Sequence, residues 1–373
     1  MNDKHLHIVT HDVPWPADFG GVMDLFYKIK SLHEKGIKIH LHCFTSKRGK
    51  QPLLNKYCQS VTYYERTGFS IHHLLKPYIV YTRSAHRLLV NLSADQHPIL
   101  MEGIHTTYWL SKGSLANKKV FVRLHNVEFE YYNRLASQEK NLFRKLYYKA
   151  EAFFLKNYER SLAGKASFIS VSKEDQQFVA DKFNYHPVHY VPVFVPWQKL
   201  RSETGQGNFC MYHGNLSINE NENVAKWLLK EVFSQLNIPF VVAGKNPSPE
   251  LVELAHQLPH TCIVANPSEH EMEDLIKKAQ INILPSFNNT GVKLKLVHAL
   301  FIGRHCITNA KGVMGSDLEV MEKYPETAAD FCQSILQCFH HPFEEADIQK
   351  RKAMLDAKFN NEQNVDALIR LIY

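Results

Sequence analysis

Two lysines beside a glycine at a predicted helix start could bind a phosphate group. In the segment from Ile281 to Ile307, an apolar strand precedes a polar turn that ends at Gly291, and a helix follows. A helix start carries unpaired backbone N–H groups and roughly half a positive charge. Because cations there oppose the helix dipole, Lys293 and Lys295 predict a bound anion. The alternative is that both lysines are only solvated surface charges.

A third lysine follows another predicted strand. Phe240 to Ala243 is apolar, and Gly244 and Lys245 come directly after it. Parallel α/β sheets bind ligands at the carboxyl ends of their strands, so Lys245 is a further phosphate candidate, with a solvated loop lysine as the equal alternative. The loop from His213 to Asn223, which includes Asn215, also follows a strand. Its amides could face a ligand, or they could only cap turns and helices.

In the first half of the chain, glycine and histidine are the candidate residues. Gly20 and Gly21 lie in the first strand-to-helix loop, where glycine allows a ligand to approach the backbone closely. The dinucleotide fingerprint GxGxxG and the Walker pattern are both absent. His125 lies in RLHNVEFEYY, directly after a strand. It could face a ligand, or the segment could simply be a helix start capped by Asn126.

Composition bounds the class of protein. The chain has 373 residues, which favours two domains. No apolar run approaches the roughly 20 residues of a membrane span, and the N-terminus lacks a signal-peptide core, so a cytoplasmic protein is expected. The seven cysteines form no CxxC pair, which indicates neither a disulfide framework nor a zinc site. A net charge of +7 suits phosphorylated small molecules or an anionic membrane surface and is too diffuse for nucleic acid.

Two alternating series of strands and helices predict an α/β fold with two parallel sheets. The expected strands are Leu6–Thr10, Ile37–Phe44, Val61–Tyr64, Ile99–Met101, Val120–Leu124 and Phe168–Val171, then Phe209–His213, Phe240–Ala243, Ile263–Ala265, Ile281–Leu284 and Cys306–Thr308. The proline-rich stretch from Tyr190 to Pro196 is expected to link the two domains. A nucleotide is expected in a cleft between them.

A long helix is expected from Ser137 to Ala163. It combines apolar residues at helical spacing with many basic residues. An amphipathic core helix with a solvated basic face is the simpler interpretation, and docking on a membrane surface is the alternative.

Taken in order, these segments resemble a GT-B glycosyltransferase, of the retaining type grouped as glycosyltransferase family 4. The resemblance spans nearly the whole chain and rests on HDVPWPADFGGVMD, RLHNVEFEYY, YVPVFVP, YHGNLS and LPSFNNTGVKLKLVHALFIGRHCITN. It implies two Rossmann-like domains, with an acceptor domain at 1–192 and a nucleotide-sugar domain at 193–344. A C-terminal helix at about 345–373 would pack back on the first domain.

The resemblance also implies roles for the candidate residues. His125 corresponds to a catalytic histidine beside the donor sugar. The donor diphosphate would be bound by Gly20, Gly21, Lys245, Gly291, Lys293 and Lys295, and the nucleotide by Asn215, Thr290 and His298. The chain departs from the family at Thr290 and His298, where two glutamates are usual. It also lacks the usual Arg and Lys pair after the first strand of the second domain.

The implied activity is transfer of a sugar from a nucleotide diphosphate sugar to a hydroxyl of a glycan or lipid-linked acceptor, in cell-surface polysaccharide or glycan biosynthesis. Retention of anomeric configuration is part of the resemblance. No cofactor is expected, and the absence of an Asp-x-Asp motif predicts metal-independent activity. The expected location is cytoplasmic, with peripheral association on the membrane. Two alternatives remain: a non-catalytic sugar-nucleotide-binding subunit and a GT-B nucleotide-sugar epimerase.

Overall fold

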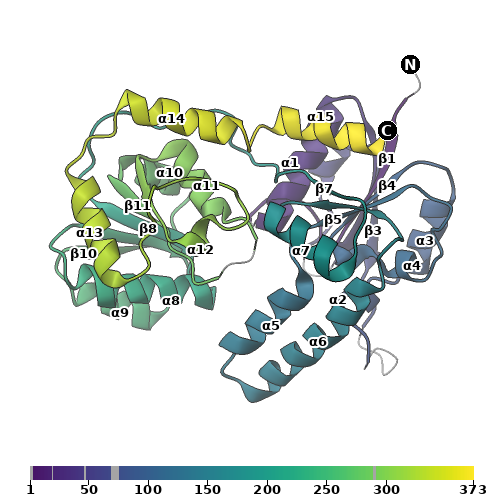
Figure 1. Cartoon of the computed structure of the whole chain (residues 1–373), viewed down its shortest axis with the longest axis horizontal. Coiled ribbons are helices and arrows are strands. Elements are labelled where there is room, and N and C mark those ends of the chain that lie inside the picture. Colours follow the sequence, from purple (N-terminus) through teal and green to yellow (C-terminus); the bar gives the residue numbers. More distant parts are fainter. Residues whose placement is uncertain (1–2, 19, 46–47, 69–74, 289–290) are drawn as a thin grey trace. The chain divides into compact units, whose positions relative to one another are not determined.

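The chain divides into two compact units, each built on its own parallel sheet (Figure 1). The computed structural model describes residues 3–18, 20–45, 48–68, 75–288 and 291–373. The first unit comprises Met1–Pro196 together with Phe359–Tyr373, and the second comprises Trp197–Lys358. Both units are α/β, as the alternating sequence pattern predicts.

The first unit contains a seven-stranded sheet in the order β3-β2-β1-β4-β5-β6-β7, with every neighbouring pair parallel. Its strands are β1 His5–Thr10, β2 Lys38–Thr45, β3 Ser60–Glu65, β4 Ile99–Glu102, β5 Val120–Leu124, β6 Ser167–Ser170 and β7 Val188–Tyr190. The predicted strands in this half are all present, and β7 was not predicted.

Helices cover both faces of this sheet. They are α1 Gly20–Glu34, α2 Tyr78–Tyr81, α3 His86–Ser93, α4 Tyr108–Ser111, α5 Glu128–Gln138, α6 Leu142–Arg160, α7 Lys173–Phe183 and α15 Asn361–Ile372, with short 3₁₀ turns η1 Pro52–Lys56 and η3 Ile104–Thr106. Because side chains alternate along a strand, Leu6 and Ile8 of β1 join one core with α1 and α15, and Val9 joins the other with α3.

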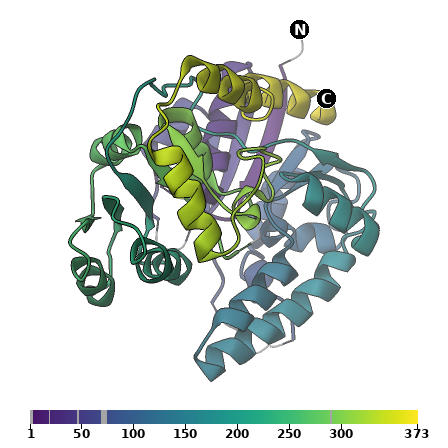
Figure 2. The same cartoon turned by 60° about the vertical axis from the view of Figure 1, so that its left-hand side comes forward.

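The single helix expected from Ser137 to Ala163 is wrong. The structure has α5 and α6, which run side by side in both views (Figure 1 and Figure 2). Asn141 ends the intervening turn, and its side chain accepts from the backbone N–H groups of Phe143 and Arg144, a helix cap. At the other end of the pair, the Glu159 carboxylate accepts from the N–H groups of Glu128 and Phe129. Glu159, rather than Asn126, therefore caps α5.

The second unit contains a five-stranded sheet in the order β10-β9-β8-β11-β12, again entirely parallel. Its strands are β8 Cys210–Asn215, β9 Phe240–Lys245, β10 Thr261–Ala265, β11 Ile281–Ile283 and β12 His305–Ile307. Its helices are α8 Asn219–Trp227, the π-helical turn η4 Leu228–Phe233, α9 Pro249–His256, α10 Glu269–Lys278, α11 Leu294–Ile302, α12 Ala310–Val313, α13 Ala328–Phe339 and α14 Glu345–Asp356.

The C-terminal segment contains two helices where the sequence predicted one at about 345–373. α14 lies in the second unit and α15 in the first. The side chain of Asn360 caps α15, and the amide of Asn361 exchanges hydrogen bonds with the backbone of Val195. The chain thus returns to the first unit only from Phe359 onward.

Membrane-spanning helices are not among those found here. Within the described ranges, no helix is both long enough and apolar enough to cross a bilayer.

Candidate functional site

In the first unit, three histidines lie just beyond the carboxyl ends of neighbouring strands. His11 follows β1, His105 follows β4 and His125 follows β5. The ring centroids of His11 and His105 are 5.2 Å apart, and those of His11 and His125 are 6.0 Å apart. This is the sheet edge at which parallel α/β folds bind ligands.

Two of these imidazoles have unused nitrogen atoms. The Nδ1 atoms of His11 and His105 are buried and find no hydrogen-bond partner among the described residues. Burial lowers the pKa of both side chains well below the usual range, and the guanidinium of Arg83 lowers it further. Both rings are therefore neutral near pH 7 and can donate to or accept from a hydroxyl group.

His125 is oriented by a buried group of charges. Its Nε2 lies 3.0 Å from the Glu102 carboxylate, and its Nδ1 lies 3.9 Å from Asp24. Lys28 bridges the same two carboxylates, at 2.9 Å from Asp24 and 2.8 Å from Glu102. Arg123 donates to both oxygens of Asp24, at 3.0 and 3.1 Å. Only His125 of this group reaches the surface, with 14% of its side chain exposed.

In this group, the negative charges of Asp24 and Glu102 are offset by the positive charges of Lys28 and Arg123. Burial alone would raise the pKa of Asp24, but Arg123 and Lys28 hold that pKa far below its usual range. Burial would likewise raise the pKa of Glu102, but Lys28 and His125 lower it. Asp24, Glu102 and His125 present ligand atoms within 4.8 Å of one another, a spacing that could hold a metal ion. Lys28 already lies between the two carboxylates, so a cation would have to displace it.

Gly20 and Gly21 form the first turn of α1, as predicted. Gly20 is exposed, and the first turn contains no acidic residue to satisfy the helix dipole. Asp24 and Lys28 follow on the same helix at spacings of four and eight residues. The N-terminus of α1 therefore lies at the sheet edge that carries the histidines, and the first-turn amides of a helix have no acceptor within the helix itself.

In the second unit, the predicted residues Asn215, Lys245 and Lys295 are connected. Asn215 ends β8, and Lys245 ends β9 directly opposite it in the strand register. The side-chain amide of Asn221 donates to the Asn215 carbonyl at 2.9 Å, and its oxygen accepts from Lys295 at 2.9 Å. Lys245 is exposed. Asn221 thus links the carboxyl end of β8 to the start of α11, and Lys245 lies beside Asn215 at the end of β9.

Lys295 is a desolvated cation. It donates to the hydroxyl of Tyr212 at 2.9 Å and to Asn221, both uncharged acceptors. Burial lowers its pKa to about 8, Lys293 lowers it further, and Glu220 opposes them. Within the described ranges, no carboxylate lies within ion-pair distance of its ammonium group. A phosphate group would supply the missing counter-charge.

The start of α11 differs from the prediction. The helix begins at Leu294, not near Gly291, because Gly291 has a left-handed backbone (φ 64°) that cannot continue a helix. Gly315 packs against it so closely that a Cβ would lie 3.2 Å from the Gly291 carbonyl carbon. The amides of Leu294 and Leu296 bond to preceding carbonyls, so fewer donors are free than the sequence predicted. Lys293 is partly exposed, and its ammonium donates to the Gly291 carbonyl. Thr290 lies outside the described residues.

His298 lies deeper along α11 and is packed on both sides. Its ring stacks on Trp197, with centroids 4.4 Å apart, and its Nε2 lies 3.7 Å from Glu273. Burial lowers its pKa to about 4, although Glu273 opposes this shift. The edge of its ring faces His213 on β8, whose Nε2 also has no hydrogen-bond partner among the described residues. A role for His298 in nucleotide binding stays a prediction.

Sequence reasoning missed several residues that these contacts bring forward. His11 and Glu102 each come one place beyond a predicted strand and Asn221 lies within a run of polar residues, which are weak signals, and the other residues had no local signal. The missed residues are His11, Asp24, Lys28, Arg83, Glu102 and His105 in the first unit and Tyr212, Glu220 and Asn221 in the second.

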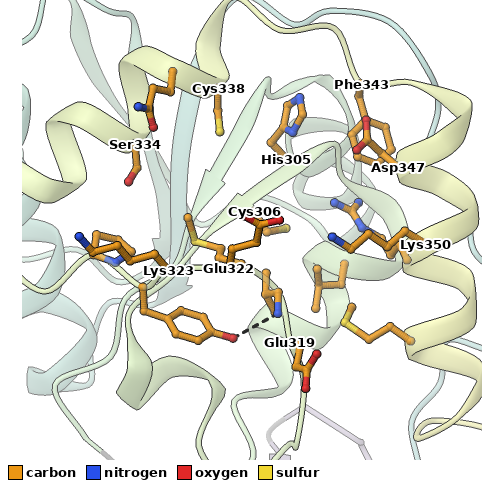
Figure 3. Close-up of a pocket in the computed structure, with 18 of the residues that line it drawn as sticks. His305, Cys306, Glu319, Glu322, Lys323, Ser334, Cys338, Phe343, Asp347 and Lys350 are labelled. Atoms are coloured by element: carbon orange, nitrogen blue, oxygen red, sulfur yellow. Dashed lines mark hydrogen bonds between the residues drawn. The ribbon is translucent and has the colours of Figure 1, made fainter.

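The second unit also contains a cavity of about 810 Å³ that involves none of the predicted residues. Figure 3 shows the side chains that line it, which come from α13, α14 and the segment from Asp317 to Pro325 and include Glu319, Lys323 and Lys350. Acidic and basic side chains are mixed on its walls. This balance gives no preference for a polyanion, so the lysine site at the strand ends fits a diphosphate better.

Comparisons with known proteins show which family and which folds the chain resembles. Residues 207–340 match the family model described as glycosyl transferases group 1. The chain is 26% identical over 313 residues to an uncharacterised 44.6 kDa protein in the cps region of Klebsiella pneumoniae, with 79% of each chain covered. Among solved structures, TarM matches at a TM-score of 0.68 and 11% identity, covering 99% of this chain and 98% of TarM.

A second solved structure, Anabaena HepE in complex with UDP and glucose, matches at a TM-score of 0.64 and 11% identity, with 99% of each chain covered. A glycosyltransferase from Rickettsia africae matches at 0.65 and 12% identity, covering 100% of this chain and 98% of that one. At these identities the structural matches establish the fold, which is GT-B.

Proposed function

We propose, from the premise that this chain is a group 1 glycosyltransferase with the GT-B fold, that it transfers a sugar from a nucleoside diphosphate sugar to a hydroxyl of a glycan or lipid-linked acceptor. The relative in a cps region supports a place in surface polysaccharide biosynthesis. Matched structures containing UDP support a nucleotide-sugar donor.

The observation that carries the proposal is the buried ammonium of Lys295, which has no carboxylate within ion-pair distance among the described residues. It is fixed by Tyr212 and Asn221 at the carboxyl end of β8, and both acceptors are neutral. When the bond between C1 of the sugar and the diphosphate breaks, negative charge grows on the departing oxygen. A preorganised cation at that position stabilises the charge as it develops, which lowers the barrier. Lys293 and Lys245 would add further positive charge.

His125 is proposed to contact the donor sugar. Glu102 holds its Nε2, so the ring orientation is fixed while 14% of the side chain stays exposed. In this role, His125 positions the sugar by hydrogen bonding. The Glu102 carboxylate, acting through His125, stabilises the partial positive charge that develops on the sugar ring. Retention of configuration is proposed on the resemblance alone.

A lipid-linked acceptor is supported by the outer face of α6. Leu142, Leu146 and Phe153 are 73%, 65% and 63% exposed, and they fall within about 40° of arc on the helix. Leu155 and Tyr158, on the opposite side, are buried. Lys145 and Lys149 lie along one side of the exposed apolar stripe. An apolar stripe beside lysines suits an anionic lipid surface, which would bring the enzyme to its acceptor.

Thermal unfolding with a panel of nucleoside diphosphate sugars tests the donor. The true donor should raise the midpoint in proportion to the logarithm of its excess over Kd. Release of nucleoside diphosphate should then depend on an added lipid-linked or polysaccharide acceptor. Binding without release would favour a non-catalytic subunit, and conversion of the sugar without any acceptor would favour an epimerase. No stabilisation by any member of the panel would contradict the proposal.

A further inference from the structure

A cluster of histidines lies at the amino ends of the strands in the first unit. The tripeptide His-Leu-His occurs twice, as His5 to His7 on β1 and as His40 to His42 on β2. The two strands are parallel neighbours, and His7 pairs with His40 in the register. Because side chains alternate, all four imidazoles lie on one face of the sheet. His97, just before β4, adds a fifth ring.

Three of these histidines converge at the surface. Nδ1 of His5 lies 2.9 Å from Nε2 of His40. The ring of His97 stacks on His5 with centroids 4.5 Å apart and lies 5.7 Å from the ring of His40. One nitrogen from each ring lies within 4.8 Å of the others, and all three side chains are partly exposed. An ion in solvent can therefore reach them.

The surroundings orient the rings for coordination. Nδ1 of His40 lies 3.0 Å from the Ser60 hydroxyl, which leaves Nε2 directed at His5. Metal-binding histidines usually use their second nitrogen in this way. Below this layer, His7 contacts both Asp95 and His42, so those groups are already paired and support the outer three.

We propose that His5, His40 and His97 bind a divalent transition metal ion of the zinc type. Three neutral imidazoles plus a water molecule form a common four-coordinate set. Tetrahedral coordination at about 2.0–2.1 Å separates the ligand nitrogens by roughly 3.4 Å. Because the three nitrogens already lie within 4.8 Å of one another, they need to close by at most about 1.4 Å. The stacked ring of His97 turns about its Cβ–Cγ bond. The proton that lies between His5 and His40 moves through solvent to the nitrogen of the same ring that does not face the metal, so both imidazoles stay neutral.

This site is separate from the proposed catalytic residues. His5 begins β1, and His11 follows its carboxyl end, so six residues of strand separate the two edges by roughly 20 Å. The metal would join β1, β2 and the segment before β4, and it would stabilise the first unit without taking part in sugar transfer.

Cobalt titration of the full-length protein tests the proposal. Co²⁺ bound by three imidazoles in a tetrahedral site should give visible absorption bands at one equivalent, and Zn²⁺ should displace it. His40→Gln and His97→Asn should each weaken binding at least about tenfold. His270→Gln, at an exposed histidine of the second unit, is the matched control and should bind normally.

Thermal unfolding gives an independent readout. Zn²⁺ should raise the unfolding midpoint of the unaltered protein and of His270→Gln, and it should raise the midpoint of His97→Asn much less. His97 lies in a loop, so its replacement should leave folding normal. Circular dichroism of each variant confirms that it is folded. The metal site would be overturned if His40→Gln and His97→Asn both bound the metal with unchanged affinity, or if the unaltered protein showed no one-to-one metal binding.

Discussion

The ammonium nitrogen of Lys295 lies 2.9 Å from the hydroxyl of Tyr212 and 4.6 Å from the centroid of the same ring. That hydroxyl in turn donates to the backbone carbonyl of Asn221, which fixes the tyrosine. The tyrosine thus holds the lysine in place with its oxygen and its π face without cancelling the charge. A cation positioned but not neutralised is what a diphosphate site requires.

Replacing Lys295 with methionine should weaken donor binding by at least about tenfold, because a charge-assisted hydrogen bond contributes roughly 1.5–3 kcal/mol. Isothermal titration with the donor, or with its nucleoside diphosphate, measures the change. Lys278→Met is the matched control, because Lys278 lies on α10 with 70% of its side chain exposed. Equal losses in the two variants would remove Lys295 from the site.

Donor affinity should fall as the pH rises above about 8. The pKa of Lys295 is about 8, lowered by burial, so the side chain is charged below that pH and neutral above it. If the diphosphate binds only the charged form, affinity falls about tenfold per pH unit over that range. The donor affinity of the Lys295→Arg variant should not change with pH over this range, because arginine remains protonated.

The same pKa has an opposite effect on folding. Between about 8 and the usual 10.5, the unfolded chain binds a proton that the folded chain lacks, so the free energy of unfolding rises with pH. Falling donor affinity together with rising stability is therefore the signature of Lys295. A donor affinity independent of pH from 7 to 10 would contradict its role.

Much of the fold was predictable because apolar strands and glycine turns are local signals. Eleven of the twelve strands in the described part of the chain were found from the sequence. The exception is β7, which has only three residues and is too polar to stand out. The break between α5 and α6 was missed because Asn141 fits both a helix interior and a cap. Its capping bonds decide the matter, and they are visible only in the structure.

The site was harder to predict because its connections are long-range. Lys295 and Asn215 were chosen from their local patterns, but Asn221, which joins them, sits in a polar run where every amide looks alike. Glu102 was missed because its strand was expected to end at Met101. The partners of a buried charge come from distant segments, and no local periodicity encodes them.

Replacing Asp24 with asparagine should destabilise the protein by about 3–5 kcal/mol, because Lys28 and Arg123 would lose their shared carboxylate within a buried site. Urea unfolding measures the change, and Asp181→Asn at an exposed position of α7 is the control. Because the pKa of Asp24 is depressed in the folded state, its contribution is present above about pH 4 and is lost at more acid pH. The difference in the free energy of unfolding between Asp24→Asn and the parent should therefore become smaller as the pH falls. A difference that does not change with pH would argue against the charge network.

Sugar transfer should continue in the presence of EDTA. The carboxylate pair beside His125, Asp24 and Glu102, already holds Lys28 at 2.8–2.9 Å, and the proposed diphosphate site uses lysines in place of a divalent ion. Measuring nucleoside diphosphate release with EDTA, and then with added Mg²⁺ or Mn²⁺, checks this. Loss of turnover in EDTA that either ion restores would show that the lysines do not suffice.

Polar substitutions on the outer face of α6 should release the protein from anionic lipid vesicles. Burying an apolar side chain contributes roughly 1.5–3 kcal/mol, so Leu146→Ser and Phe153→Ser should each reduce vesicle binding at least about tenfold. Both side chains are more than half exposed, so the free energy of unfolding should barely change. Leu336→Ser on α13, at a leucine that is 52% exposed, is the control. High salt should also weaken binding, because Lys145 and Lys149 act through screened charge. Vesicle sedimentation that is equal for all variants would mean that this stripe faces something other than lipid, and the acceptor would then have to reach the enzyme through solution.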